Sequence, residues 1–262
     1  MDNRYFFEKG LQQAKVLAKS TGQSVTISNE IGDIVELDKN ETAHLVKVRR
    51  AKVGDTITGF CGDGYDYELQ IENIGKTTTC KLVKITRNKS FLTTPVTVFL
   101  STLKNDALNE SVDNLTQLNV KNIVLFDTKF SVANIDDDKL EKLRTRSIQA
   151  CKQCERADFV NISSMKYKQV IECLKDYDLV LFAYENTTNP FVSDLKDFKG
   201  KKIALIVGCE GGFSEKEAEE FNKIAKTISL GKTILRAPVA CTALTSAVMS
   251  GLGEWGAVST NK

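Results

Sequence analysis

The hydrophobic positions of this chain follow two different rhythms, and the change from one to the other comes near Pro95. Residues 1–90 contain short runs rich in β-branched and aromatic residues, separated by glycine–aspartate pairs such as Gly54–Asp55. Runs of this kind are typical of β-strands joined by tight turns. Their even spacing predicts a small β-barrel over residues 1–90, with a linker over 87–95. The expected strands are residues 24–28, 34–37, 55–60, 65–71 and 78–85.

From residue 95 onward, apolar strand-like runs alternate with stretches of helical periodicity. Such alternation is typical of a mostly parallel sheet whose two faces are covered by helices. The pattern therefore predicts an α/β domain over residues 95–262. The expected strands are residues 96–101, 122–126, 178–183 and 201–207, and the expected helices are about residues 105–118, 138–154, 165–175, 214–226 and 239–253.

A glycine-rich turn, Gly208–Phe213, follows the last of these apolar strands. Ser214 and Glu217 after it have the spacing of a capping box, so a helix is expected to begin there. This places the turn at the carboxyl edge of the sheet, where ligands of α/β proteins usually bind. A second loop of the same kind covers residues 228–242. The two loops together predict a small-molecule pocket that is lined mainly by backbone.

The same turn has a simpler interpretation, because glycine accepts a positive φ that other residues avoid. On that interpretation, Gly211 or Gly212 only closes a tight turn. The turn lacks both the spacing of a dinucleotide-binding fingerprint and the Lys-Ser/Thr pair of a phosphate-binding loop. Glu210 is interpreted either as a ligand contact or as an acid stabilised by a nearby helix N-terminus.

The composition is that of a soluble globular protein without a strong overall charge. Charged residues make up 27% of the 262 residues, hydrophobic residues make up 42%, and the formal net charge is +2. An RNA-binding surface would therefore have to be a local patch. No apolar run reaches the roughly 18 residues that a membrane span needs. Seven cysteines, an odd number, are typical of a reducing compartment, and we expect a cytoplasmic protein.

Side chains for nucleophilic or metal-based catalysis are scarce. His44 is the only histidine and lies in the predicted barrel, so a Ser-His-Asp or Cys-His machinery is not expected. Cys151 and Cys154 have the spacing of a metal or redox pair, but no second pair completes a zinc site. Their position in the middle of a predicted helix favours two buried cysteines, and no metal is expected.

Basic and amide side chains share one face of the helix predicted near residues 139–156. A solvated polar face is the usual explanation, but a stripe that is nearly all basic or amide also suits RNA phosphates and base edges. Two basic runs in the predicted barrel, residues 47–52 and 81–89, allow the same two interpretations: surface charge, or an RNA platform near Arg4–Phe7. The helix stripe consists of Lys142, Arg146, Gln149, Gln153 and Arg156.

Several short motifs occur in an order and spacing that are specific when taken together. They are Arg4–Phe7, His44–Arg50 with Gly54–Asp55, Lys104 at the start of a helix, Thr116–Val120, Ala150–Arg156, Gly208–Ser214, Leu230–Arg236 and Ala240. Through these motifs the chain resembles, from end to end, the RsmE-type 16S ribosomal RNA methyltransferases of the SPOUT superfamily.

The resemblance implies a PUA-like barrel over residues 1–90 and a trefoil-knotted α/β domain over residues 95–262, in a protein that works as a homodimer. Knots are rare in proteins, and no periodicity in this sequence indicates one. The resemblance also implies transfer of a methyl group from S-adenosylmethionine to N3 of a uridine in small-subunit (16S) ribosomal RNA.

Roles for individual residues follow from the same resemblance. Arg236 and Arg156 would hold the uridine anion or its phosphates, and Glu210 or hydroxide would take the N3 proton. RNA would be contacted by Arg4, Arg50, Lys104 and Gln153. The cofactor would be held by Val207, Gly208, Gly211, Gly212, Leu230, Gly231, Leu235 and Ala240.

Some positions depart from the family pattern. Cys209 stands where proline is usual, Gln117 where glutamate is usual and Asn119 where glycine is usual. Asn114 replaces a common lysine, and residues 237–239 replace the usual Thr-Glu-Thr. The departures at Gln117, Asn119 and residues 237–239 leave open a non-catalytic RNA-binding protein of the same fold. A second alternative is a SPOUT methyltransferase that acts on another RNA nucleoside, because the predicted barrel does not fix the target base.

Overall fold

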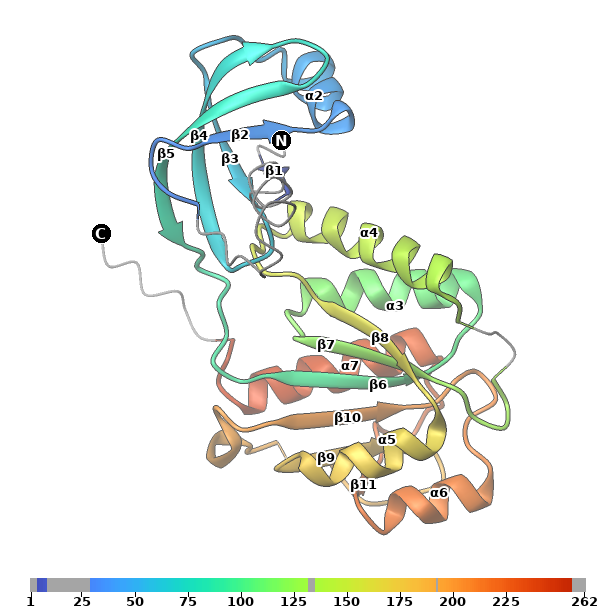
Figure 1. The fold of residues 1–262 in the computed structure, drawn as a ribbon. Helices are drawn as coiled ribbons and strands as arrows, with labels where there is room; N and C mark the ends of the chain where they lie inside the picture. The colour runs from blue at the N-terminus through green and yellow to red at the C-terminus, as the bar shows by residue number, and fades with distance from the viewer. Residues whose placement is uncertain (1–3, 9–28, 132–134, 192, 256–262) are drawn as a thin grey trace, which may run out of the picture. The chain divides into compact units, whose positions relative to one another are not determined.

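The computed structural model describes residues 4–8, 29–131, 135–191 and 193–255, which fold into two compact units (Figure 1). The first unit contains the described residues up to Phe91 together with Cys151–Phe159. The second unit contains the described residues of 92–150 and those from Val160 onward. The strand expected at residues 24–28 lies outside the described residues.

A five-stranded sheet forms the framework of the first unit. Its strands are β1 (Arg4–Phe6), β2 (Ile34–Leu37), β3 (Thr56–Phe60), β4 (Tyr65–Ile74) and β5 (Thr78–Arg87), in the order β1-β3-β4-β5-β2. Neighbouring strands are antiparallel except β1 and β3, which run parallel. After β2, the chain forms helix α2 (Lys39–His44) and a π-helical turn, Leu45–Arg49. Asp38 begins α2 because its side chain accepts a hydrogen bond from the Glu41 amide at 2.8 Å.

Alternation along β4 shows why these residues form a strand. Tyr67, Leu69 and Ile71 are buried, whereas Glu68 and Gln70 between them are exposed. Successive side chains of a strand point to opposite faces of the sheet, so β4 covers the core of the first unit with one face. The same core contains Tyr5, Phe7, Val35, Leu37, Leu45, Ile57, Cys80 and Leu82.

Gly62, between β3 and β4, is a position where a close approach requires glycine. Its φ is +89°, and a Cβ there would lie 2.2 Å from the ring of Phe159. Phe159 in turn packs edge-on against Phe6 and Phe60. This packing explains why Cys151–Phe159 belongs to the first unit although it follows much of the second unit in the chain.

Six parallel strands form the sheet of the second unit. They are β6 (Val96–Ser101), β7 (Asn122–Phe126), β8 (Asn161–Met165), β9 (Leu179–Ala183), β10 (Ile203–Val207) and β11 (Lys226–Ile228), in the order β11-β9-β10-β6-β7-β8. The helices between and after them are α3 (Asn105–Gln117), α4 (Asp137–Gln153), α5 (Tyr167–Cys173), α6 (Glu215–Asn222) and α7 (Ala237–Gly251). Short 3-10 turns occupy Leu174–Asp176 and Lys196–Phe198.

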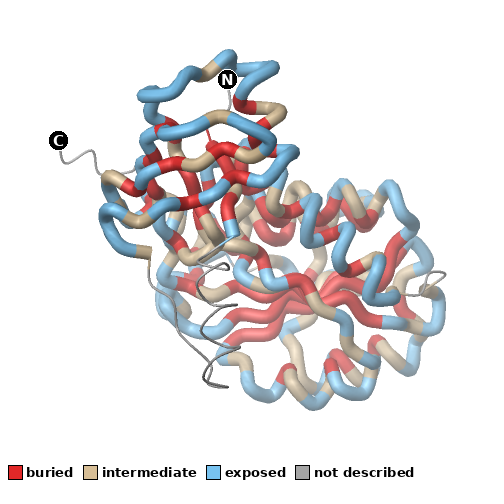
Figure 2. The backbone as a smooth tube through the Cα atoms, turned by 45° about the horizontal axis from the view of Figure 1, so that its top comes forward, coloured by how far each residue is buried: buried red, intermediate tan, exposed pale blue. Residues whose placement is uncertain are grey.

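Helices cover both faces of this sheet, so its four inner strands β6, β7, β9 and β10 are buried along almost their whole length (Figure 2). Val98 and Phe99, successive residues of β6, belong to different apolar clusters because their side chains leave opposite faces. The cluster around Val98 includes residues of α3, α4 and α7, and the cluster around Phe99 includes residues of α5 and α6. The predicted α/β architecture with a mostly parallel, doubly covered sheet is confirmed.

The expected and observed elements agree best where a strand is apolar along its whole length. β6 and β7 have the expected bounds, and the helices begin and end within four residues of their expected positions. The sequence pattern missed β8, which is partly exposed and contains Ser163 and Ser164, and β11, which has only three residues. None of the helices in the described part of the chain combines the length and the apolarity needed to cross a membrane.

Candidate functional site

A small cavity opens at the carboxyl ends of β9 and β10, which are neighbours in the parallel sheet of the second unit. Its volume is about 160 Å³, and three separate segments of the chain line it. The first follows β9, the second is the glycine turn after β10, and the third is the loop before α7. The lining residues are Ala183, Tyr184, Glu185, Val207, Gly208, Cys209, Glu210, Gly212, Ser229, Leu230, Gly231, Lys232, Thr233, Ile234, Leu235, Ala237 and Ala240.

The two loops singled out in the sequence therefore share one cavity. Seven of the eight residues expected to hold a cofactor line it, and Gly211 does not. A Cβ on Gly211 would lie 2.8 Å from the Cβ of Phe130, so Gly211 instead packs closely against the segment after β7. The small size of Gly211 is explained by this packing.

Gly212 gives the turn its shape. Its φ is +66°, and its amide donates a hydrogen bond to the Cys209 carbonyl at 2.9 Å, as expected for a tight turn. A Cβ on Gly212 would lie 2.8 Å from Oε1 of Glu185, across the cavity wall. Helix α6 then begins with the predicted capping box, since Ser214 and Glu217 bond each other's backbone amides.

The second loop is fixed at both of its ends. Ser229 donates its amide hydrogen to the Asn189 carbonyl at 2.8 Å, and Gly231 has a φ of +126°. At the other end, Pro238 occupies the first turn of α7, where a missing amide hydrogen has no cost. Arg236 is the N-cap of α7 and is exposed. Its neighbours Leu235 and Ala237 line the cavity, but Arg236 itself does not.

Glu210 lines the cavity and lies at the start of a helix. Its carboxylate accepts a hydrogen bond from the backbone amide of Lys104 at 3.3 Å. Lys104 is the N-cap of α3, so the carboxylate lies at the positive end of that helix. The sequence indicated only a nearby helix N-terminus, and the structure identifies it as that of α3. Lys104 does open a helix, as expected.

Several lining residues were missed in the sequence. Tyr184 and Glu185 directly follow β9, and Tyr184 is held to the edge strand by a bond from its amide to the Ile228 carbonyl at 3.1 Å. A signal for them existed, because carboxyl ends of adjacent parallel strands meet at one edge. The order of the strands, which makes β9 a neighbour of β10, was not readable from the sequence.

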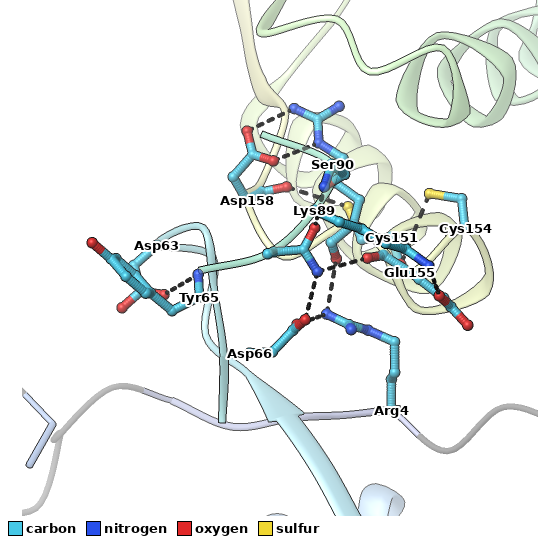
Figure 3. A network of polar contacts seen from close by, with 12 residues as sticks. Arg4, Asp63, Tyr65, Asp66, Lys89, Ser90, Cys151, Cys154, Glu155 and Asp158 are labelled. Atoms are coloured by element: carbon cyan, nitrogen blue, oxygen red, sulfur yellow. Dashed lines mark hydrogen bonds and ion pairs between the residues drawn. The ribbon is translucent and has the colours of Figure 1, made fainter. Parts of the chain in front are cut away.

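The first unit holds a network of charged side chains around Arg4 (Figure 3). Arg4 is buried and forms an ion pair with Asp66 at 2.7 Å. Asp66 also accepts a hydrogen bond from the Asn88 amide at 2.8 Å, and Lys89 pairs with Glu155 at 2.8 Å. The ammonium of Lys89 lowers the pKa of Glu155. Arg4 is thus anchored inside the unit by Asp66.

Arg156 does not share the exposed face of α4, and this part of the sequence analysis was wrong. The helix ends at Gln153, and the chain turns away through Glu155, whose φ is +60°. Arg156 is 1% exposed and donates two hydrogen bonds to Asp158, both at 3.0 Å. The remaining members of the stripe, Lys142, Arg146, Gln149 and Gln153, are exposed as expected.

Cys151 lies in the last turn of α4 and Cys154 directly follows the helix, so the pair is not in mid-helix as predicted. Burial raises the pKa of Cys151 to about 12 and also raises the pKa of Cys154. Neither thiol is therefore activated as a thiolate. Across the described ranges, no group of histidine, cysteine and acidic residues is arranged to hold a metal ion.

A polar cavity of about 750 Å³ lies in the first unit. Two of the residues expected to contact RNA, Arg4 and Gln153, line it, whereas Arg50 is exposed elsewhere on this unit, after the π-helical turn. Beside the cavity, the Arg87 guanidinium lies over the ring of Phe91, 3.9 Å from its centroid. The lining residues are Arg4, Thr58, Asp66, Glu68, Thr86, Arg87, Asn88, Lys89, Lys152, Gln153 and Glu155.

Two of the departures from the family pattern fit their structural positions. Asn119 has a φ of +65° directly after α3, a left-handed conformation that asparagine accepts most readily after glycine. Asn114 donates a hydrogen bond to the Thr242 hydroxyl at 3.2 Å, which ties α3 to α7. Asn119 thus fits the turn after α3, and Asn114 joins two helices of the second unit.

Comparison with known proteins identifies the family. The family model described as an RNA methyltransferase domain matches residues 91–249. A Rickettsia conorii protein named ribosomal RNA small subunit methyltransferase E is 31% identical over 212 residues, which cover 79% of this chain and 85% of that protein. The Bacillus subtilis protein of the same name is 26% identical over 215 residues, which cover 76% of this chain and 83% of that protein.

A solved structure shows the same fold. The Legionella pneumophila protein Lpg2936, determined in complex with the bound cofactor SAM, matches with a TM-score of 0.78 at 19% identity. The match covers 95% of this chain and 98% of that one. With the family model and the Rickettsia relative, the conclusion is that this chain belongs to the RNA methyltransferase family, among the ribosomal RNA small subunit methyltransferase E proteins.

Proposed function

We propose that this protein transfers a methyl group from S-adenosylmethionine to N3 of a uridine in 16S ribosomal RNA. The observation that carries the proposal is the shared cavity, because the glycine turn Gly208–Gly212 and the loop Ser229–Leu235 line it together. It opens at the edge of a parallel sheet where α/β proteins bind nucleotide-like ligands. Family membership supplies the reaction class, and the relatives' names supply small-subunit ribosomal RNA as the substrate.

The shape of the cavity supports S-adenosylmethionine as the cofactor. Cβ atoms at Gly208 and Gly212 would each come within 2.8 Å of a neighbouring side chain, so the wall is formed by bare backbone. Backbone amides and carbonyls, with Val207, Leu230 and Leu235, offer an adenosine both hydrogen bonds and apolar contact. The volume of about 160 Å³ is smaller than the whole cofactor needs, so the bound molecule extends over the rim.

The residues around the cavity suit a displacement reaction that depends on alignment and charge. S-adenosylmethionine supplies an activated methyl group on a sulfonium. The uridine must lose its N3 proton before it accepts that group, and Glu210 at the cavity wall is the proposed proton acceptor. Arg236, exposed beside the lining, is the proposed partner of the negative charge that spreads over O2 and O4. We assign Arg156 to structure because its guanidinium is buried against Asp158.

We propose that charged and amide side chains in each of the two units contact RNA. Arg50 and Gln153 are exposed on the first unit, and Lys104 is exposed at the start of α3 in the second. Arg4 contributes through the polar cavity it lines, held in place by Asp66. Contacts of this type position the RNA through its phosphates and base edges.

The family also suggests the larger organisation of the protein. We propose that residues 1–90 are a PUA-like barrel and that residues 95–262 form a SPOUT domain with a trefoil knot. We further propose a homodimer in the cytoplasm, where small ribosomal subunits are the partner and no membrane is involved. Sedimentation of the purified protein measures the oligomeric state directly, and a monomer at micromolar concentration would contradict the dimer.

The decisive experiment is mass spectrometry of the nucleosides of 16S ribosomal RNA from a strain that lacks this protein. Loss of 3-methyluridine, restored by the intact gene, supports the proposed reaction. Loss of a different methylated nucleoside would show a SPOUT methyltransferase with another target. No change in any nucleoside, together with no S-adenosylmethionine binding in calorimetry, would show a non-catalytic RNA-binding protein.

A further inference from the structure

The positive and negative charges of the side chains that line the cavity of the second unit do not cancel. Two carboxylates, Glu185 and Glu210, and one ammonium, Lys232, belong to its lining, which leaves one net negative charge. The cavity is small, so each charge on its wall lies close to whatever occupies it. A ligand with one net positive charge would complement this lining.

The two carboxylates are not equivalent. Glu210 is engaged by the backbone amide of Lys104, which offsets part of its charge. Glu185 has no hydrogen-bond or ion-pair partner within the described part of the chain, and its Oε1 lies 2.8 Å from the Cβ position of Gly212. A Cβ at position 212 would require this flexible carboxylate to move away from the turn. Its charge is therefore the one most available to a ligand.

We propose that Glu185 makes this site prefer the cationic methyl donor over its uncharged product. The inference rests on the proposed function and adds a specificity-determining residue to it. In the transfer, the carbon–sulfur bond breaks, its electron pair stays on sulfur, and a new bond forms between the methyl carbon and N3 of the uridine anion. S-adenosylmethionine, with a net charge of +1, thereby becomes S-adenosylhomocysteine, with a net charge of zero.

An attraction to the sulfonium is present before transfer and absent after it. Glu185 thus strengthens donor binding and leaves product binding nearly unchanged, which favours release of the product and rebinding of the donor. Glu185 is exposed, so solvent screens its field, and the expected effect is moderate. Loss of one such charge corresponds to about a tenfold change in donor affinity.

The test is isothermal calorimetry of the full chain with S-adenosylmethionine and, separately, with S-adenosylhomocysteine. The variant Glu185→Gln removes the charge and keeps the shape. We expect its Kd for the donor to rise about tenfold and its Kd for the product to change less than twofold. The matched control is Glu219→Gln, the same charge change on an exposed residue of α6 outside the cavity, for which both Kd values stay as in the unmodified protein.

The outcomes separate this inference from the function on which it rests. If Glu185→Gln weakens both ligands equally, Glu185 contacts a group that they share, such as the ribose or the amino group, and the charge proposal is overturned. Unchanged affinity for both ligands overturns it as well. If the unmodified protein binds neither ligand, the proposed function itself fails. A thermal melt of Glu185→Gln, expected to match the unmodified protein, shows that the variant is folded.

Discussion

Gly212 and Glu185 stand against each other across the wall of the cavity, with 2.8 Å between Oε1 of Glu185 and the position that a Cβ on Gly212 would take. They come from the ends of two different strands, β10 and β9, which the sheet makes neighbours. Both residues line the cavity, and the glycine at position 212 is required by its φ of +66°, which closes the turn.

Replacement of Gly212 by alanine should impair cofactor binding. The new methyl group must displace Glu185, and a φ of +66° costs a non-glycine residue about 1–2 kcal/mol. We expect a lower free energy of unfolding by about that amount and at least tenfold weaker binding of S-adenosylmethionine in calorimetry. Gly75→Ala, at a glycine of the first unit with a negative φ and room for a Cβ, is the control and should leave binding intact.

Arg236→Ala should reduce methyl transfer without weakening the binding of S-adenosylmethionine. Arg236 is exposed beside the cavity and is not part of its lining, so its proposed contact is with the RNA base and not with S-adenosylmethionine. Removal of one charge-stabilising group is expected to lower kcat by about 10²-fold. The measurement pairs a tritium-transfer assay on 16S ribosomal RNA with calorimetry. Full activity would remove Arg236 from the mechanism, and Lys216→Ala on α6 serves as the charge control.

Lys152 and Glu41 form a buried ion pair, and removal of one partner should strongly destabilise the first unit. Their atoms are 2.8 Å apart, and the two side chains are 7% and 8% exposed. Lys152→Met leaves a buried carboxylate without its partner, which costs about 3–5 kcal/mol in the free energy of unfolding measured with urea. The double variant Lys152→Met with Glu41→Leu should recover most of this loss.

The exposed pair Lys89–Glu155 provides the comparison for that experiment. Its side chains are 63% and 59% exposed, so solvent screens their attraction. Lys89→Met is expected to cost less than about 1 kcal/mol. Equal losses for Lys152→Met and Lys89→Met would contradict the view that burial makes the first pair important.

Stability should fall in alkaline solution because of buried thiols. Burial raises the pKa of Cys80 and Cys151 from 9.0 to about 12. Between these values the unfolded chain releases protons that the folded chain keeps, so the free energy of unfolding declines as pH rises from 9 towards 12. Below pH 9 the contribution of both thiols is fully present. Urea unfolding of Cys151→Ala across this range should give a shallower decline, and a parallel decline would contradict the assignment.

RNA binding should weaken steeply as salt is added. If several phosphates are contacted, the logarithm of the binding constant falls linearly with the logarithm of salt concentration. Arg50→Ala removes one exposed cation from the first unit and should reduce the slope by about 1. Lys76→Ala, between β4 and β5, is the control and should leave the slope unchanged if the basic run at residues 47–52 is the contact surface. A flat salt response would remove phosphate contact from the proposal altogether.

Arg156 and Arg4 show which side-chain contacts local sequence patterns do not reveal. Both are basic and lie in motifs that suggested RNA contact, and the structure buries both side chains, with Arg156 1% exposed and Arg4 7% exposed. Their partners, Asp158 and Asp66, have no spacing in the sequence that marks them as acceptors for these arginines. Whether a cationic side chain faces solvent or a buried carboxylate depends on long-range packing, which the local periodicity of the sequence does not reveal.

Periodicity and turn chemistry alone determined the alternation of strands and helices, the start of α6 at its capping box and the glycine turn with its positive φ. These are local properties, since each depends on residues a few positions apart. The tertiary structure decided which strands are neighbours, and thereby which loops share a cavity. The tertiary structure also places Glu185 next to Gly212 and packs Gly211 against Phe130. It brings the Glu210 carboxylate to the N-terminus of α3. Such contacts join residues far apart in the chain, and their energies arise only when the sheet has brought its strand ends together.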